Sequence, residues 1–466
     1  MAEETTIELK RAALNHYFQN LNTPQQQAVF HVNGPVLVLA GAGSGKTTAM
    51  IHRIVQMIHF GDGWVQANAS ITKEDAAYLK DYIADKQPAD LERLCSILAV
   101  QPIQPWHILA ITFTNKAANE LRSRLLQAIG EECASMLHAS TFHSACVRIL
   151  RRSISKLGYD SNFTIYDTDD SQRLMKSCIA DADVSEKQFP PRAVLTEISL
   201  AKDRMCSPEY FCIEAGSDYR KMVIGKLYKE YQNRLKSANA LDFDDLIYKT
   251  VELLESFQEE LEYYQNRFRY IMVDEYQDTN HAQFRLVQLL SQKHQNLCVV
   301  GDDDQSIYRF RGATIENILN FEKQFQNAVV IRLEQNYRST KTILEAANDV
   351  IAHNAGRKEK TLWTDLEDGK KIIWYKAVDE TDESRFVAEK IEKEVQNGAS
   401  YQDFAVLYRM NAQSNNIERM FVKEKIPYHI YGGTRFYDRK EIKDVLAYMT
   451  ILYNPFDMVR FKRIVN

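Results

Sequence analysis

The stretch of sequence that decides the fold is Val36-Leu37-Val38-Leu39-Ala40-Gly41-Ala42-Gly43-Ser44-Gly45-Lys46-Thr47. Its first five residues are an unbroken apolar run, which is typical of a parallel strand buried on both faces. The glycines that follow let backbone N–H groups turn toward an anion, and Lys46 and Thr47 open a segment with apolar residues at helical spacing. Strand, glycine-rich turn and helix in this order predict a phosphate-binding loop, with Ala40 in the place of the pattern's first glycine. The alternative is a glycine-rich turn that binds no ligand.

ATP with Mg²⁺ is the ligand that such a loop predicts. Lys46 is expected to reach the β- and γ-phosphates, and the hydroxyl of Thr47 is expected to ligate Mg²⁺. The residues expected to surround the phosphates are Ala40, Gly41, Ala42, Gly43, Ser44, Gly45, Lys46, Thr47 and Thr48.

Acidic and amide side chains follow two further apolar runs. Residues 271–273 are followed by Asp274 and Glu275. We expect Asp274 to hold Mg²⁺ through water, and we expect Glu275 to orient or deprotonate the attacking water. Residues 297–300 lead into Gly301-Asp302-Asp303-Asp304-Gln305, where Gln305 is a candidate sensor of the γ-phosphate because an amide both donates and accepts. The alternatives are two solvated acids at a strand end and a solvated acidic loop.

The spacing of these runs predicts an α/β fold with a parallel sheet. A fourth run, at 108–113, joins them, and amphipathic segments lie between the runs. In open α/β sheets, ligands collect at the carboxyl ends of the strands, where all of these motifs fall. Roughly 150 mostly helical residues separate 113 from 271, so we expect an inserted helical domain there. Further strands are expected at 329–333, 372–375 and 404–408, and residues 71–86 and 91–98 are expected to be helical.

Composition excludes several classes of protein. With 466 residues, 45% of them apolar and 26% charged, the chain predicts about three globular domains. No apolar run reaches the ~18 residues of a membrane span, and the polar first ten residues do not resemble a secretory signal. The seven scattered cysteines never form a CxxC pair, which favours a reducing, cytoplasmic compartment over a zinc site or a disulfide framework. A net charge of −5 means that any nucleic-acid contact must be local.

Taken together, the motifs resemble those of superfamily 1 DNA helicases of the UvrD/Rep/PcrA type. They occur in the family's order at residues 21–25, 40–54, 112–118, 141–143, 241–245, 274–278, 301–312, 333–339 and 408–414. Apart from the phosphate-binding loop each motif is weak by itself, but the combination is very specific.

The resemblance implies further nucleotide contacts. Gln25 resembles the glutamine that reads the edge of adenine, and Tyr337 resembles the aromatic residue that stacks on the base, with Arg53 near it. Arg338 resembles the arginine that the second motor lobe places on the γ-phosphate. Without the family, a cap glutamine, a core tyrosine and a surface arginine are the ordinary interpretations. The residues expected to act in hydrolysis are Lys46, Glu275, Gln305 and Arg338.

Single-stranded DNA is the expected partner, together with junctions of single and double strands. Aromatic faces and cations alternate in Tyr308-Arg309-Phe310-Arg311, which starts three residues after Gln305, so a shift at the γ-phosphate is expected to move stacked bases. Phe310 stands where the family usually has tryptophan, which predicts weaker stacking. The residues expected to contact DNA are Thr112, Phe113, Asn115, Thr141, His143, Tyr308, Phe310, Arg311, Arg409 and Asn411. A lone histidine is more often packed or solvated, and RNA remains an alternative substrate.

The expected domains follow from the same resemblance. Residues 1–115 and 220–328 form the first RecA-like lobe, with an extra helical excursion at 61–104. Residues 116–219 are the helical insertion, 329–431 the N-terminal part of the second RecA-like lobe, and 432–466 the truncated start of a further helical subdomain.

The expected activity is ATP-driven translocation and unwinding of DNA in repair or replication restart, with 3′-to-5′ travel implied by the resemblance. Because the family's later motifs are absent, we expect a fragment with weak ATPase activity. The alternatives are a nucleotide-gated DNA-binding fragment without unwinding activity and the helicase part of a recombination helicase-nuclease.

Overall fold

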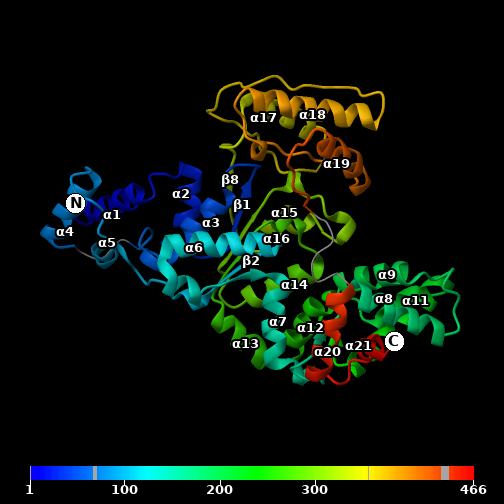
Figure 1. Ribbon diagram of the computed structural model, residues 1–466. Coiled ribbons are helices and arrows are strands. Elements are labelled where there is room, and N and C mark those ends of the chain that lie inside the picture. The colour runs from blue at the N-terminus through cyan, green and yellow to red at the C-terminus, as the bar shows by residue number, and fades with distance from the viewer. Residues whose placement is uncertain (1, 67–70, 355, 432–439, 466) are drawn as a thin grey trace. The chain divides into compact units, whose positions relative to one another are not determined.

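The computed structural model describes residues 2–66, 71–354, 356–431 and 440–465 (Figure 1). The chain forms two compact units, one made of Met1–Asp368 with Ala447–Asn466 and the other of Gly369–Leu446. Each of the seven cysteines lies in the described ranges and carries a free thiol. Among the described helices, none combines the length and the apolar character that a membrane crossing requires.

A parallel six-stranded sheet is the centre of the first unit, in the order β3-β2-β6-β7-β1-β8. Its strands are β1 (Val36–Ala40), β2 (Ile108–Thr112), β3 (His138–Thr141), β6 (Tyr270–Val273), β7 (Leu297–Gly301) and β8 (Val329–Leu333). All residues of β1, β2 and β7 are buried, as expected for strands covered on both faces. The parallel α/β fold predicted from the apolar runs is therefore confirmed.

Alternate residues of each strand face two separate apolar cores. On one face Val36, Val38 and Ala110 pack against α1 (Ala2–Tyr17), α2 (Thr23–Phe30), α3 (Lys46–Val55) and α6 (Asn115–Met136). On the other, Leu37 and Leu39 share a core with α7 (Phe142–Ser153), α12 (Phe243–Ser256), α13 (Gln258–Arg267), α14 (His281–Ser291), α15 (Glu316–Leu319) and α16 (Phe321–Gln324). In Figure 1, α3 and α6 lie near β1 and β2, and α7, α12 and α14 lie on the other side of the sheet.

The helical excursion packs on the first of these cores. It contains α4 (Lys73–Ile83) and α5 (Leu91–Leu98), close to the helices predicted at 71–86 and 91–98. Leu79 and Leu94 are fully buried in the same core as α1. A parallel bridge between Gly61 and Val100 closes the base of the excursion.

A separate helical cluster lies within the region where we expected the insertion. Its core is formed by α8 (Thr168–Asp181), α9 (Pro191–Asp203), α10 (Pro208–Ala215) and α11 (Tyr219–Ser237), next to the short pair β4 (Thr164–Ile165) and β5 (Ala240–Leu241). Strand β3 belongs to the six-stranded sheet and α6 packs against that sheet. We had expected residues 116–219 to lie in the insertion and outside the first lobe. The sequence of β3, His-Ala-Ser-Thr, is short and polar and lacks the apolar run that marks the other strands.

The C-terminal helix of the first unit packs on this cluster. Figure 1 shows α21 (Met458–Val465, red) beside α8. The fully buried Asp457 accepts hydrogen bonds from Tyr166 (2.7 Å) and Thr164 (3.1 Å), so this contact is specific and polar. The helix α20 (Lys440–Tyr453) precedes it, and the turn expected at Gly432-Gly433 lies outside the described residues.

Strand β8 belongs to the sheet of the first unit, although we expected residue 329 to begin the second lobe. It pairs with β1 from Val36 with Val329 to Ala40 with Leu333, and α17 (Lys341–Ile351) follows it within the same unit. The second unit, from Gly369, has a small core between α18 (Glu380–Gln396) and α19 (Ser414–Lys423). Within its described part, the segments at 372–375 and 404–408 form no regular strand, so the strands expected there are not found.

Candidate functional site

The phosphate-binding loop connects β1 to α3 as predicted. Gly43 (φ 65°) and Gly45 (φ 81°) take left-handed backbone angles, which glycine adopts without steric cost. Gly45 is the N-cap of α3 and offers no side-chain cap, so the first N–H groups of α3 are available to an anion. This geometry fits a phosphate group.

Two of these glycines are also enclosed by other parts of the unit. A Cβ added at Gly45 would lie 2.5 Å from Nε2 of Gln25, and one added at Gly43 would lie 2.5 Å from Nδ2 of Asn336. The loop is thus held between α2 and the segment after β8, and a side chain at either glycine would displace one of them.

The carboxylates after β6 face the loop. The ammonium of Lys46 lies 3.3 Å from Oε2 of Glu275 across 229 residues of sequence. Glu275 has a left-handed backbone (φ 49°), and its N–H donates to Oδ1 of Asp274 (3.0 Å). Burial and the neighbouring Glu275 raise the pKa of Asp274 to about 6, although Lys46 acts in the opposite direction. The hydroxyl-bearing Thr47 and the carboxylate of Asp274 are oxygen donors of the kind that Mg²⁺ prefers.

Gln277 is a site residue to which we assigned no role from the sequence. Its Nε2 donates to Oε2 of Glu275 (2.9 Å), and its Oε1 accepts from the N–H of Asp302 (2.9 Å). Gln305 in turn donates to Oδ2 of Asp302 at 2.5 Å. Gln277 is 1% exposed, so a buried amide joins the acid after β6 to the loop after β7. Its position two residues after Glu275 was the available signal.

The acids of this second loop are buried. Asp302 and Asp303 are 2% and 5% exposed, so the alternative of a solvated acidic loop is wrong.

Gln25 and Tyr337 each form a hydrogen bond to the phosphate-binding loop. Gln25 forms a capping box with Asn22 at the start of α2, and its Nε2 donates to the carbonyl of Ser44 (3.0 Å). It therefore both caps a helix and contacts the loop. The N–H of Tyr337 donates to the carbonyl of Gly43 (3.0 Å), its hydroxyl accepts from Asn22 (2.8 Å), and its ring is half exposed.

Arg53 and Arg338 differ in their exposure to solvent. Arg53 is 3% exposed and donates to the carbonyls of Ala28 (2.6 Å) and Val32 (3.0 Å), so its guanidinium stabilises the end of α2. Arg338 is exposed and belongs to the same compact unit as the loop, directly after β8. A Cβ at Gly43 would meet the Cβ of Arg338 at 2.8 Å.

A cavity of about 630 Å³ lies between the sheet lobe and the helical cluster. Phe113, Phe243, Tyr308 and Phe310 contribute aromatic rings to its lining. The rings of Tyr308 and Phe310 are 6.1 Å apart and inclined by 42°, and Phe310 is 74% exposed. Exposed aromatic faces beside a cavity are the arrangement that stacks unpaired bases.

The other residues expected to contact DNA divide into three groups. His143 lines the cavity, edge-on to Phe243 at 5.7 Å, and burial lowers the pKa of its imidazole. Thr112 and Thr141 are buried, and their hydroxyls bond neighbouring turns. The remaining predicted residues are Asn115, at the start of α6, Arg311, whose side chain is not described, and Arg409 and Asn411 in the second unit.

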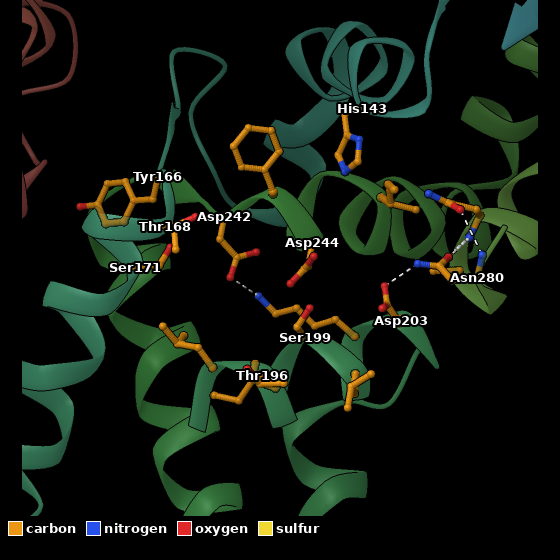
Figure 2. Close-up of a pocket in the computed structure, with 18 of the residues that line it drawn as sticks. His143, Tyr166, Thr168, Ser171, Thr196, Ser199, Asp203, Asp242, Asp244 and Asn280 are labelled. Atoms are coloured by element: carbon orange, nitrogen blue, oxygen red, sulfur yellow. Dashed lines mark hydrogen bonds and ion pairs between the residues drawn. The ribbon is translucent and has the colours of Figure 1, made fainter. Parts of the chain in front are cut away.

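Charged groups form another part of the cavity wall, where Figure 2 labels Asp203, Asp242 and Asp244. Lys202 is buried and lies 2.7 Å from Asp242. Burial by itself raises the pKa of Asp242, but Lys202 outweighs it and holds that pKa below its ordinary value. Asp203 accepts from Asn280 at 2.5 Å, and burial with the nearby Asp244 raises the pKa of Asp203 to about 7. This wall was not predicted, because residues 241–245 were noted only as a motif.

Comparison with known proteins adds two kinds of match. The family described as "UvrD/REP helicase N-terminal domain" matches residues 21–68 and 91–326, and the "UvrD-like helicase C-terminal domain" matches 331–466. The unmatched residues between 68 and 91 include α4. Proteins named "ATP-dependent DNA helicase PcrA" from Staphylococcus aureus (strain Mu50) and Staphylococcus epidermidis (strain ATCC 12228) are 46% identical over 455 and 453 residues. These alignments cover 98% and 97% of this chain and 56% of each relative, so the chain spans about half the length of the curated relatives it matches.

Proposed function

Because the chain belongs to the UvrD/REP helicase family, we propose that it contains the ATP-hydrolysing and strand-binding part of a single-stranded DNA translocase and helicase. The observation that carries this proposal is the hydrogen-bonded path Lys46–Glu275–Gln277–Asp302–Gln305, which ends three residues before Tyr308. The proposed nucleotide pocket and base-stacking surface would thereby be joined through a chain of hydrogen bonds. Work in DNA repair or replication restart, at junctions as well as on single strands, is part of the proposal, as is 3′-to-5′ travel.

The phosphate side of this path supports ATP hydrolysis. Lys46 and the first N–H groups of α3 would bind the β- and γ-phosphates, and Thr47 with Asp274 would hold Mg²⁺. Bound Mg²⁺ supplies positive charge to the phosphate oxygens. Glu275 is the base that would orient the attacking water. Its ion pair with Lys46 holds the carboxylate at the pocket until a bound phosphate replaces it as the partner of Lys46. Arg338, adjacent to Gly43, is proposed to contact the γ-phosphate.

The stacking side supports binding of a flexible strand. Tyr308 and Phe310 present ring faces at the cavity, with Phe113 on its wall, and none of these groups distinguishes one base from another. A movement of Gln305 toward or away from the phosphates would shift the backbone that carries Tyr308. Translocation is then a cycle in which nucleotide binding and release alternate the grip on successive bases.

A nucleotide-gated strand-binding unit without unwinding activity is the second candidate. It is favoured by the contacts Lys46–Glu275–Gln277–Asp302–Gln305, which join the phosphate-binding loop to the stacking surface and by themselves require no separation of a duplex. The helicase part of a helicase-nuclease is a further alternative. Duplex unwinding with a tailed substrate distinguishes the first two candidates.

The test is ATP turnover with and without oligo(dT). We expect stimulation by DNA in the unmodified chain, and we expect Glu275→Gln to reduce turnover by about 10²-fold or more while both ligands still bind. Glu262→Gln, on the exposed side of α13, is the matched control. Turnover by Glu275→Gln at the unmodified rate would show that the base is assigned wrongly. An affinity for DNA that is the same with and without nucleotide would refute the proposed translocase function.

A further inference from the structure

A buried lysine neutralises the acidic loop that carries Gln305. The side chain of Lys360 is 3% exposed, and its ammonium lies 2.8 Å from Asp302 and 2.6 Å from Asp304, with Asp303 also in contact. Carboxylate oxygens of these three acids lie within 4.8 Å of one another, a spacing that suits a cation. The chain itself supplies that cation from a position 57 residues further along.

The segment around Lys360 is bound along its length to the nucleotide site. We name residues 357–365 the strap. Arg357 forms two hydrogen bonds to Asp304 (2.9 and 2.7 Å) and one to the carbonyl of Lys360 (3.0 Å). The N–H of Lys358 donates to Asp303 (2.7 Å). The strap therefore holds the acidic loop through two cations and a backbone group.

The other half of the strap lies against the phosphate-binding loop. The N–H of Asn336 donates to the carbonyl of Trp363 (2.7 Å), and the Nδ2 of Asn336 donates to the carbonyl of Ala42 (2.6 Å). A Cβ at Gly41 would lie 2.1 Å from the side chain of Leu362. One short segment thus contacts both the loop expected to bind phosphate and the loop that carries Gln305.

Asp302 is the point at which Lys360 acts on the site. Its Oδ1 faces Lys360, its Oδ2 accepts from Gln305, and its N–H donates to Gln277, which bonds Glu275. Without the ammonium, three adjacent buried carboxylates would repel one another and Arg357 alone would oppose that repulsion. The loop would then move or take up protons, and Gln305 would lose its fixed position.

We propose that Lys360 is a positioning residue for ATP hydrolysis, which holds Asp302 and through it the amide of Gln305 at the phosphate site. The inference rests on the proposed ATPase function. The ammonium of Lys360 is buried among the three aspartates, so it would act on hydrolysis through the position of Gln305. Nucleotide binding is proposed to depend on Lys46 and α3. Replacing Lys360 is therefore expected to lower kcat and to leave the affinity for nucleotide nearly unchanged.

The experiment compares Lys360→Met with Lys358→Met in oligo(dT)-stimulated ATPase. Lys358 is the matched control because it lies two residues away and its ammonium pairs with Glu322 instead of the aspartates. We expect Lys360→Met to lower kcat by about tenfold or more, since small displacements at a reacting centre have effects of that size. The Kd for a fluorescent ATP analogue is expected to stay within about threefold of the unmodified value. Lys360→Arg, which keeps the charge, should recover most of the loss.

A double-mutant cycle separates positioning from general destabilisation. If Lys360 acts through Gln305, Lys360→Met combined with Gln305→Ala turns over no more slowly than Gln305→Ala alone. Amide exchange at residues 301–305 should also accelerate in Lys360→Met and not in Lys358→Met. If Lys360→Met does not fold, Lys360→Gln takes its place in the cycle, because its amide can still donate to Asp302 but carries no charge.

Multiplicative losses in the cycle, or a kcat of Lys360→Met equal to that of Lys358→Met, would overturn the proposal. A wild-type chain that does not hydrolyse ATP with DNA present would instead refute the function on which it rests.

Discussion

The side-chain amide of Gln277 donates a 2.9 Å hydrogen bond to Oε2 of Glu275, the same oxygen that faces Lys46. This contact fixes the carboxylate proposed to position the attacking water. The amide oxygen of Gln277 binds the N–H of Asp302, so one buried side chain aligns two strand ends.

Replacing Gln277 with methionine tests that alignment. The variant keeps the volume but leaves the N–H of Asp302 without its partner, and a lost buried hydrogen bond costs about 1–3 kcal/mol. We expect the free energy of unfolding to fall by that amount and kcat for ATP to fall with it. Urea unfolding and steady-state ATPase are the measurements. Gln292→Met, at an exposed position, should change neither; an unaltered kcat in Gln277→Met would show that Glu275 needs no such support.

Alanine at Gly45 tests the geometry of the phosphate-binding loop. The added Cβ meets Nε2 of Gln25 at 2.5 Å and is also strained by the positive φ. Gly34→Ala is the matched control, because Gly34 has a similar φ of 79° but open space around a Cβ. Both variants should lose about 1–2 kcal/mol of stability from backbone strain. Only Gly45→Ala should lose nucleotide binding, measured by titration with a fluorescent analogue; equal binding by both variants would contradict this.

Substitutions at Phe310 test the stacking surface. Removing a ring that stacks on one base costs about 1–3 kcal/mol, so Phe310→Ala should weaken oligo(dT) binding roughly five- to hundredfold. Phe310→Trp should strengthen it, since indole offers a larger face. Fluorescence anisotropy at constant salt measures both. Tyr210→Ala, another exposed aromatic, is the control, and the prediction fails if its effect equals that of Phe310→Ala.

The raised pKa of Asp203 predicts that the stability of the fold depends on pH. Burial and Asp244 raise its pKa to about 7, whereas the unfolded value is near 4, so folding favours the protonated acid. Its stabilising contribution is complete below about pH 4 and is lost as the pH rises to about 7. Asp203→Asn keeps an oxygen that accepts from Asn280 and never ionises. We expect this variant to melt at a higher temperature than the unmodified chain at pH 8, with a smaller gain at pH 5 and none below about pH 4.

Thermal unfolding at several pH values measures this difference. Asp160→Asn, at an exposed position, should show no pH-dependent change relative to the unmodified chain. A gain for Asp203→Asn that persists unchanged at pH 5 would mean that the ionisation of Asp203 is not its cause.

Local patterns predicted much of the fold. The runs at β1, β2, β6 and β7 were visible because strands buried on both faces need uninterrupted apolar residues. The polar strand β3 was not visible, since its place depends on pairing with β2. Strand β8 was found but assigned to the second lobe, because its sequence carries no information about its partner β1.

The same distinction holds in the candidate site. Lys46, Asp274 and Glu275 were predicted because each follows a strand in a recognisable pattern, and the structure brings Lys46 and Glu275 together. The contacts of Arg53 were not predicted, since nothing in its neighbourhood in sequence shows that its guanidinium binds carbonyls of α2. In the sequence alone, residues 302–304 are compatible with a solvated acidic loop. The structure instead places the ammonium of Lys360 among their carboxylates.

The sequence by itself determined the strand that leads into a glycine-rich turn and a helix, the acids at strand ends, and the family, because these depend on residues close together in the chain. Tertiary structure decided which of those residues meet. Parallel register places the ends of β1, β6, β7 and β8 at one edge of the sheet, and only there do Lys46, Gln277 and Lys360 find partners far away in sequence.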